Sequence, residues 1–407
     1  MRRTDPARAE PALAGFALAA ETDWRRILVL ASAVGFFEAL LFAVLAPLLP
    51  DFEAELGLSK AGAGLLTSVY AAGAFLGALP SIWAARRLGV KTTVLAGLIL
   101  FALSTAAFTD PGSAWLVFVA RIGQGCGSAF AYTGALAWLA AVSPPGRRGE
   151  AIGITFAATF SGELFGPLLG ATAAWAGVAL VFSTVAVLAA LLAVATATLR
   201  APAAEAVSPP SLRVLAGNRV VRLGAWLIAL TALLLGMLGV LAPLRLDELG
   251  WGPAAIGVVF AVAALLQAVA NPFVGRVADA KGNVLPLRAG LIVAGGASAL
   301  LVLDRRVFLY AVIVIVAGVA YATLWTPALA LLSQTLERHG FDQAFGFGLM
   351  SATWPPGFAI GAAAGGALAG ATRDAWPYLL ACIVCLLSLP LLGRSLPERE
   401  RGLEGVR

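Results

Sequence analysis

Long apolar runs, divided by short polar segments, form the main pattern along this chain. The runs are roughly 20 residues long, the length of α-helix that crosses the hydrocarbon core of a bilayer. Charged side chains gather between the runs and are nearly absent from their centres. This pattern predicts an all-α integral membrane protein.

Twelve transmembrane helices are predicted, in two sets of six. A polar segment over residues 1–26 precedes the first set, a loop over 200–222 divides the sets, and a polar segment over 394–407 follows. We expect residues 27–199 and 223–393 to form one six-helix bundle each. The predicted spans are 27–49, 61–84, 91–109, 113–142, 151–174, 178–199, 223–244, 253–275, 286–303, 307–333, 344–371 and 376–393.

Positively charged residues predict the orientation. If the N-terminus is cytoplasmic, the cytoplasmic segments hold 22 of the 28 Lys and Arg residues and the outer loops hold 5. Lys and Arg concentrate in the cytoplasmic loops of membrane proteins, so both termini are expected in the cytoplasm. The same placement explains the net charge of +6 without a nucleic-acid partner. The alanine- and arginine-rich usage favours a plasma membrane, that of a bacterium (its inner membrane).

Composition narrows the chemistry. Of the 407 residues, 60% are hydrophobic and 12% are charged, against about 25% charged in a soluble protein. Cys126, Cys382 and Cys385 lie in apolar runs, and the single histidine, His339, lies in a loop. We therefore expect no metal site and no cofactor. The chain has no phosphate-binding loop, nucleophile elbow or HExxH motif, so neither enzyme activity nor ATP drive is expected.

The two sets of helices repeat each other. A fixed offset over several helices indicates a duplicated half inserted in the same orientation, and so predicts two pseudo-symmetric bundles. At an offset of 193 residues, Glu55-Leu56-Gly57, Gly64, Gly89 and Gly97 reappear as Glu248-Leu249-Gly250, Gly257, Gly282 and Gly290. At an offset of 195, Gly153, Gly162, Gly166 and Gly170 reappear as Gly348, Gly357, Gly361 and Gly365.

The segment SGELFGPLLG in the fifth span carries a glycine face. Its glycines recur every four residues, so they share one side of the helix and let another backbone approach closely. Pro167 lacks an N–H and favours a bend, whereas the repeat in the eleventh span has Ala362 in its place. We interpret both faces as the surface along which the two halves slide. The faces consist of Gly162, Gly166 and Gly170, and of Gly357, Gly361 and Gly365.

An arginine lies inside the fourth span. A charge at mid-membrane costs about 2.5–3.5 kcal/mol on insertion scales, so Arg121 must face the bundle interior, water or a carboxylate. Gln124, Gly125, Ser128 and Tyr132 lie within about 60° of Arg121 on a helical wheel. These residues therefore form one polar face.

Glu38 lies near the midpoint of the first span, in the run FFEALLFAVLAPLLP. Burial favours the neutral form of a carboxyl, which suits a group that takes up and releases protons. A nearby Arg121 would favour the charged form, so the approach of the two groups would act as a switch. The alternative is that Glu38 only neutralises Arg121, and both interpretations stay open.

Polar and aromatic residues near mid-membrane are candidates for a substrate cavity. The C-terminal half has no charged residue near the middle of any span, and its aromatic side chains would favour a lipophilic or cationic ligand. Packing in the core is the alternative for each residue, and for Glu163 the two alternatives are equal. The candidates are Gln124, Tyr132, Glu163, Gln267, Tyr321, Trp325 and Trp354.

Two cytoplasmic loops contain versions of one motif. The loop NPFVGRVADAKGN has Gly275, Asp279 and Gly282 at the spacing G-x-x-x-D-x-x-G. Its carboxylate can pair with a base or a helix N-terminus and so latch the cytoplasmic side. This spacing resembles the loop signature of the major facilitator superfamily. The loop GALPSIWAARRLGVK departs from it, with Ile82 and Arg86 in place of Gly and Asp.

Three further patterns are similar to those of the same superfamily. The run R-x-x-Q-G-x-G from Arg121 resembles its proton-coupled members. Glu38 with Pro47 and Pro50 resembles the D-x8-P-x-x-P pattern of drug:proton antiporters and vesicular amine transporters, with Glu for Asp. The run G-x-x-x-G-P-x-x-G from Gly162 resembles the antiporter motif. The resemblance covers all twelve spans and implies the major facilitator fold, with two six-helix bundles rocking about a central cavity.

The resemblance implies a secondary transporter that works by alternating access. The leading hypothesis is export of a small lipophilic or cationic compound in exchange for protons, with Glu38 carrying the proton and Arg121 responding to its charge. The partners would be this compound, protons and the bilayer, and we expect a monomer. Two alternatives stay open: an importer or facilitator of a sugar, organic acid or other metabolite, and a non-transporting receptor or regulator on the same fold.

Overall fold

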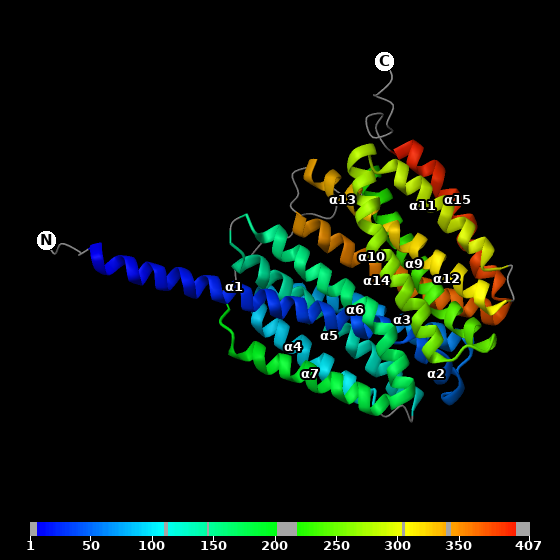
Figure 1. The fold of residues 1–407 in the computed structure, drawn as a ribbon, viewed down its shortest axis with the longest axis horizontal. Coiled ribbons are helices and arrows are strands. Elements are labelled where there is room, and N and C mark those ends of the chain that lie inside the picture. The colour runs from blue at the N-terminus through cyan, green and yellow to red at the C-terminus, as the bar shows by residue number, and fades with distance from the viewer. Residues whose placement is uncertain are drawn as a thin grey trace, which may run out of the picture.

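The computed structural model describes residues 6–109, 113–144, 146–201, 218–302, 306–338 and 343–395. Within these ranges it contains helices and no β-strand, which confirms the all-α prediction. The helices, shown in Figure 1, are α1 (Pro6–Ala43), η1 (Ala46–Leu48), α2 (Leu49–Glu55), α3 (Lys60–Arg87), α4 (Val90–Ala107), α5 (Ala114–Val142), α6 (Arg148–Ala176), α7 (Val178–Thr198), α9 (Arg219–Glu248), α10 (Pro253–Lys281), α11 (Val284–Leu300), α12 (Val307–Thr323), α13 (Trp325–Arg338), α14 (Gln343–Ala371) and α15 (Ala375–Ser395).

Each predicted span corresponds to helix in the structure. Ten segments of the described chain are long and apolar enough to cross a membrane, and α11 is a shorter apolar helix. The tenth span is divided at Leu324 into α12 and α13, and the first helix begins at Pro6, inside the predicted polar segment. Most of the loop 200–222 and of the tail 394–407 lies outside the described residues.

The repeat is visible in the backbone of the turns that precede α4 and α11. Gly89, before α4, has a φ of 85°, and Gly282, before α11, has a φ of 78°. Both values are left-handed conformations that glycine adopts without a Cβ clash. The same turn therefore precedes the third helix of each half, as the offset of 193 residues between these glycines predicts.

The glycine faces of α6 and α14 pack within their own halves. In α6 the face lies against α1, where a Cβ added to Gly166 would approach the Leu40 carbonyl oxygen to 2.8 Å. In α14 the face lies against α9 in the same manner. The interpretation of these faces as the surface between the halves is therefore wrong. The contacts are Gly162 with Phe36, Gly166 with Leu40 and Ala43, Gly170 with Val44 and Pro47, Gly357 with Ala229, Gly361 with Leu233 and Gly365 with Met237.

Two other pairs of helices join the halves. On α3, a Cβ at Gly64 would meet the Gly366 Cα of α14 at 3.1 Å, and Ala362 is also in contact. On α10, a Cβ at Gly257 would meet the Ala171 Cβ of α6 at 2.8 Å and the Pro167 carbonyl oxygen at 2.8 Å. Each residue of the second contact is the repeat counterpart of one in the first. The interface between the halves is therefore pseudo-symmetric, and Pro167 replaces an alanine inside it.

The contacts between the halves lie toward the ends of the helices that are remote from the termini. There the Phe42 and Phe358 rings of α1 and α14 meet with centroids 4.6 Å apart. In Figure 1 the two halves approach each other near α2 and diverge toward the ends that carry the N- and C-termini. In the predicted orientation, this is a molecule closed on its outer side.

An ion cluster also joins the halves at this end. Lys60 Nζ lies 2.8 Å from Glu248 Oε1 and 2.8 Å from Asp374 Oδ1. Lys60 begins α3 of the first half, whereas both carboxylates belong to the second half. Arg245 bonds the other oxygen of Glu248 at 2.8 Å. The cluster therefore stabilises the closed arrangement in particular.

Replacing Gly166 by leucine tests the packing role of the glycine face. The added side chain would collide with the α1 backbone, so we expect Gly166→Leu to destabilise the protein by roughly 1–3 kcal/mol. The measurement is the unfolding temperature of purified protein in detergent. Gly153→Leu is the matched control, because a Cβ at Gly153 on the same helix meets nothing within 4 Å. Equal unfolding temperatures for the two variants would contradict this packing.

Lys60→Met tests the ion cluster. Partly exposed ion pairs contribute about 0.2–1 kcal/mol each, so we expect a roughly fivefold shift toward separated outer ends. Spin labels at Glu55→Cys and Thr372→Cys, with the native cysteines replaced, report the distance distribution by pulsed electron resonance. Glu150→Gln is the control, because its ion pair with Arg147 lies within one half. An unchanged distribution in Lys60→Met would show that the cluster does not stabilise closure.

Candidate functional site

Arg121 is buried inside the first half and held by neighbouring helices. Its side chain is 1% exposed, and its Nη1 donates to the Leu41 carbonyl of α1 at 2.8 Å and to Gln124 Oε1 at 3.0 Å. The guanidinium carbon lies 4.6 Å from the centre of the Tyr70 ring on α3. Arg121 Nε has no hydrogen-bond partner among the described residues. The charge is thus stabilised by a carbonyl, an amide and an aromatic face.

Gln124 extends this network to α4. Its side chain is fully buried, and its Nε2 donates to Thr105 Oγ1 at 3.4 Å. The sequence analysis offered Gln124 as a cavity residue. The structure instead gives it neighbours on both sides, between Arg121 and α4.

Glu38 lies in the same network without an ion pair to Arg121. Its carboxylate accepts a hydrogen bond from Ser128 of α5, and its backbone carbonyl accepts one from the Tyr70 hydroxyl at 3.2 Å. Among the described residues, no carboxylate lies within 4.0 Å of the Arg121 guanidinium. Glu38 therefore does not neutralise Arg121 in this conformation, although both contact Tyr70.

Tyr132 and Glu163 lie beside Glu38. The Tyr132 hydroxyl is 3.4 Å from Thr159 Oγ1 of α6, and Glu163 follows Thr159 by one turn of that helix. Glu163 is half-buried and close enough to Glu38 for the two charges to interact. The structure thus brings together two carboxyls from α1 and α6.

In the second half, two of the aromatic candidates meet and one does not. Trp325 of α13 and Trp354 of α14 have ring centroids 4.7 Å apart and planes at 85°. The Tyr321 hydroxyl instead lies 2.7 Å from Ser298 Oγ of α11, with the side chain fully buried. Tyr321 therefore belongs to the core of the second half.

Asn271, a polar residue near the tryptophans, was not among the candidates chosen from the sequence. Thr326 Oγ1 donates to Asn271 Oδ1 of α10 at 3.2 Å. Gln267, a half-buried candidate, precedes Asn271 by one turn on the same helix. The sequence feature that could have identified Asn271 is the Asn-Pro pair inside an apolar span. Pro272 interrupts the backbone hydrogen bonding of α10 next to Asn271.

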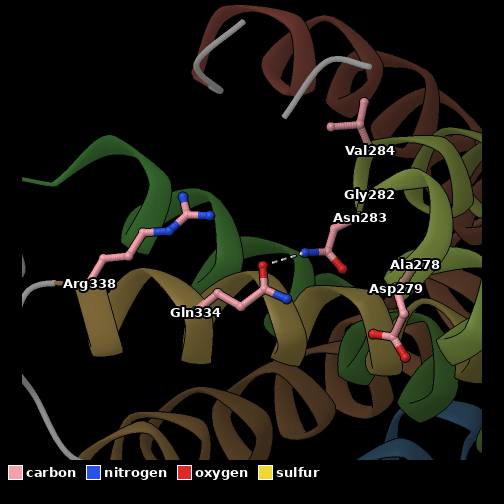
Figure 2. A pocket seen from close by; sticks show the side chains of 7 residues that line it. All are labelled: Ala278, Asp279, Gly282, Asn283, Val284, Gln334 and Arg338. Carbon is pink, nitrogen blue, oxygen red and sulfur yellow. Dashed lines mark hydrogen bonds between the residues drawn. The ribbon is translucent and has the colours of Figure 1, made fainter. Parts of the chain in front are cut away.

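The G-x-x-x-D-x-x-G motif of residues 275–282 borders a cavity of about 270 Å³ between the ends of α10 and α13. Asn283 Nδ2 donates to Gln334 Oε1 at 3.2 Å across it, as Figure 2 shows. Gly275 lies apart from the cavity, where an added Cβ would meet Thr326 Cγ2 at 3.7 Å. The lining residues are Ala278, Asp279, Gly282, Asn283, Val284, Gln334 and Arg338. Within the described part of the chain, no cluster of three or more His, Cys, Asp or Glu suits a metal ion.

Comparison with known proteins places this geometry in a family. The family model of the Major Facilitator Superfamily matches residues 31–244 and again 224–407. The Chloramphenicol resistance protein of Streptomyces lividans is 30% identical over 346 residues, which cover 81% of this chain and 84% of that protein. The MFS-type transporter ppzB of Metarhizium rileyi is 31% identical over 144 residues, and the match spans 34% of this chain and only 30% of that protein.

Solved structures agree at the level of the fold. The D-xylose-proton symporter superposes with a TM-score of 0.71 at 16% identity, over 92% of this chain and 98% of the symporter. An all-helical chain of apolar spans, with this superposition and family matches over both halves, is a membrane transporter and not an enzyme. The protein belongs to the major facilitator superfamily.

Proposed function

We propose that this protein exports a small lipophilic or cationic compound in exchange for protons. The observation that carries the proposal is Glu38, a carboxyl inside the membrane that contacts Ser128 and has no ion pair with the nearby Arg121. Intramembrane carboxyls facing a bundle interior mark proton relays in transporters. The resemblance to the Chloramphenicol resistance protein of Streptomyces lividans supports export of a drug-like compound.

The switch in this scheme is the distance between Glu38 and Arg121. With its proton bound, Glu38 stays neutral and Arg121 keeps its bonds to Leu41 and Gln124. When the proton leaves, the new charge attracts the guanidinium, whose Nε still lacks a partner among the described residues. Such charge pairing is worth more inside a membrane protein than in water. Proton release therefore moves α1 relative to α5.

Movement of α1 has two routes to the second half. The glycine face fixes α1 to α6, and α6 contacts α10 through Pro167 and Ala171. The second route consists of aromatic rings. The ring centroids of Tyr70 and Phe42 are 5.7 Å apart, and Phe42 in turn contacts Phe358 of α14. Coupling requires an element with two arrangements that both sites bias. The outer contact between the halves is that element in this proposal.

Glu38→Gln removes the titrating group and keeps its size. We expect pH-driven uptake of radiolabelled chloramphenicol into inside-out proteoliposomes to fall at least tenfold. The unfolding temperature should stay within a few degrees of wild type, because Gln can still accept from Ser128. Glu150→Gln is the control at an exposed site. Full pH-driven exchange in Glu38→Gln would refute the role of Glu38, and uptake indifferent to pH would indicate a facilitator.

Arg121→Lys tests the second member of the switch. Lysine keeps the charge but lacks the planar fork that contacts Leu41, Gln124 and the Tyr70 ring together. We expect a tenfold or greater loss of exchange rate, with equilibrium binding of chloramphenicol changed less than twofold. The comparison of the two readouts separates coupling from binding. A variant that exchanges at the wild-type rate would reduce Arg121 to a simple source of charge.

A further inference from the structure

Four residues of the second half converge from three helices, each next to a proline. Asn271 precedes Pro272 in α10, Trp325 and Thr326 precede Pro327 at the start of α13, and Trp354 precedes Pro355 and Pro356 in α14. The Trp325–Trp354 contact and the Thr326–Asn271 bond join them. We call this set, which consists of Asn271, Trp325, Thr326 and Trp354, the tryptophan wall.

Prolines interrupt the helical hydrogen bonding at the tryptophan wall. The tenth span is divided at Leu324, immediately before Trp325, although Leu324 itself keeps helical dihedral angles, with φ −64° and ψ −26°. Each proline also leaves the carbonyl four residues earlier without its helical donor. Irregular backbone at membrane depth occurs where it is buried in protein or lines a water-filled cavity. Prolines inside the spans of a transporter therefore indicate a candidate substrate site.

The wall is directed toward the first half. Asn271 lies within about 40° of Gly257 on the α10 helical wheel, and Gly257 faces α6 across the interface. Trp354 precedes Phe358 by one turn of α14, just as Glu38 precedes Phe42 by one turn of α1. Because Phe42 and Phe358 are in contact, Glu38 and Trp354 lie on the same side of that contact, toward the termini. The wall and Glu38 therefore lie at a similar depth in the two halves.

The wall combines two indoles with two polar side chains and carries no charge. Two half-buried indoles in T-shaped contact, with planes at 85°, present an aromatic face and an aromatic edge against which a flat ring can pack. Asn271 uses its amide oxygen to accept from Thr326, so its Nδ2 is the group it offers a ligand. A carbonyl, nitro or ether oxygen on the ring would accept from that donor.

We propose that the tryptophan wall is the substrate-recognition surface and that it selects a flat aromatic ring bearing a hydrogen-bond acceptor, with no charge required. The two halves then have different roles: the first half contains the carboxyls Glu38 and Glu163, and the second half contains the recognition surface. This inference rests on the transport function proposed above. It makes Asn271 a specificity residue, because loss of its donor affects only ligands that carry the acceptor.

Equilibrium binding to the purified full-length protein in lipid nanodiscs tests the proposal with three probes. Benzanilide is a neutral aromatic amide, diphenylmethane has similar rings without an acceptor, and tetraphenylphosphonium is an aromatic cation. We expect benzanilide to bind at least tenfold more tightly than diphenylmethane. Asn271→Ala should weaken benzanilide about tenfold and leave diphenylmethane unchanged, whereas Trp354→Ala should weaken both. Trp175→Ala is the matched control, because Trp175 is 88% exposed near the outer end of α6.

Several outcomes would overturn the proposal. For Asn271→Ala, these outcomes are unchanged binding of benzanilide or an equal loss of affinity for benzanilide and diphenylmethane. For the wild-type protein, they are binding of tetraphenylphosphonium alone or binding of none of the three probes. Glu38→Gln separates this inference from the proposed function. Normal benzanilide binding with exchange abolished supports both, whereas normal binding with exchange retained removes the proton scheme and leaves the wall intact.

Discussion

A guanidinium inside the membrane constrains the whole first half. Arg121 must be satisfied by protein groups, because hydrocarbon offers none. Its bonds reach the α1 backbone, Gln124 and the Tyr70 ring, so α1, α3 and α5 are tied to one buried charge. The arrangement leaves Nε without a partner among the described residues. That donor is the group that the proposed switch would pair with Glu38 after its proton leaves.

Close backbone approach serves two different purposes in this fold. The glycine faces on α6 and α14 hold helices that stay together within a half. Gly64 and Gly257 instead lie in the contact between the halves, where α3 packs closely on α14 and α10 packs on α6. Lys60 adds charge to that contact at the ends remote from the termini. Glycine therefore permits close helix packing both within each half and between the halves.

The duplication supplied two similar bundles, and their side chains now differ. The first half contains Glu38, Arg121 and Glu163 within its spans, whereas the second has an uncharged wall with a pair of tryptophans. In the proposed scheme, keeping titrating groups away from the recognition surface lowers the free-energy cost of placing a lipophilic ring there, because no charge must lose its solvation to admit the ring. The Phe42–Phe358 contact connects the two regions.

The sequence by itself determined the apolar helices and the repeat, because span length and the placement of charge reflect bilayer thickness. It also identified Arg121, Glu38 and the tryptophans, since polar or aromatic groups stand out in apolar runs. Helical periodicity defines a face without saying what that face meets. For this reason only the tertiary structure decided that Gly166 packs on α1, that Tyr321 bonds Ser298 in a core, that Asn271 joins the tryptophans and that Lys60 bridges the halves. These contacts join residues far apart in the chain, so they depend on how the helices pack.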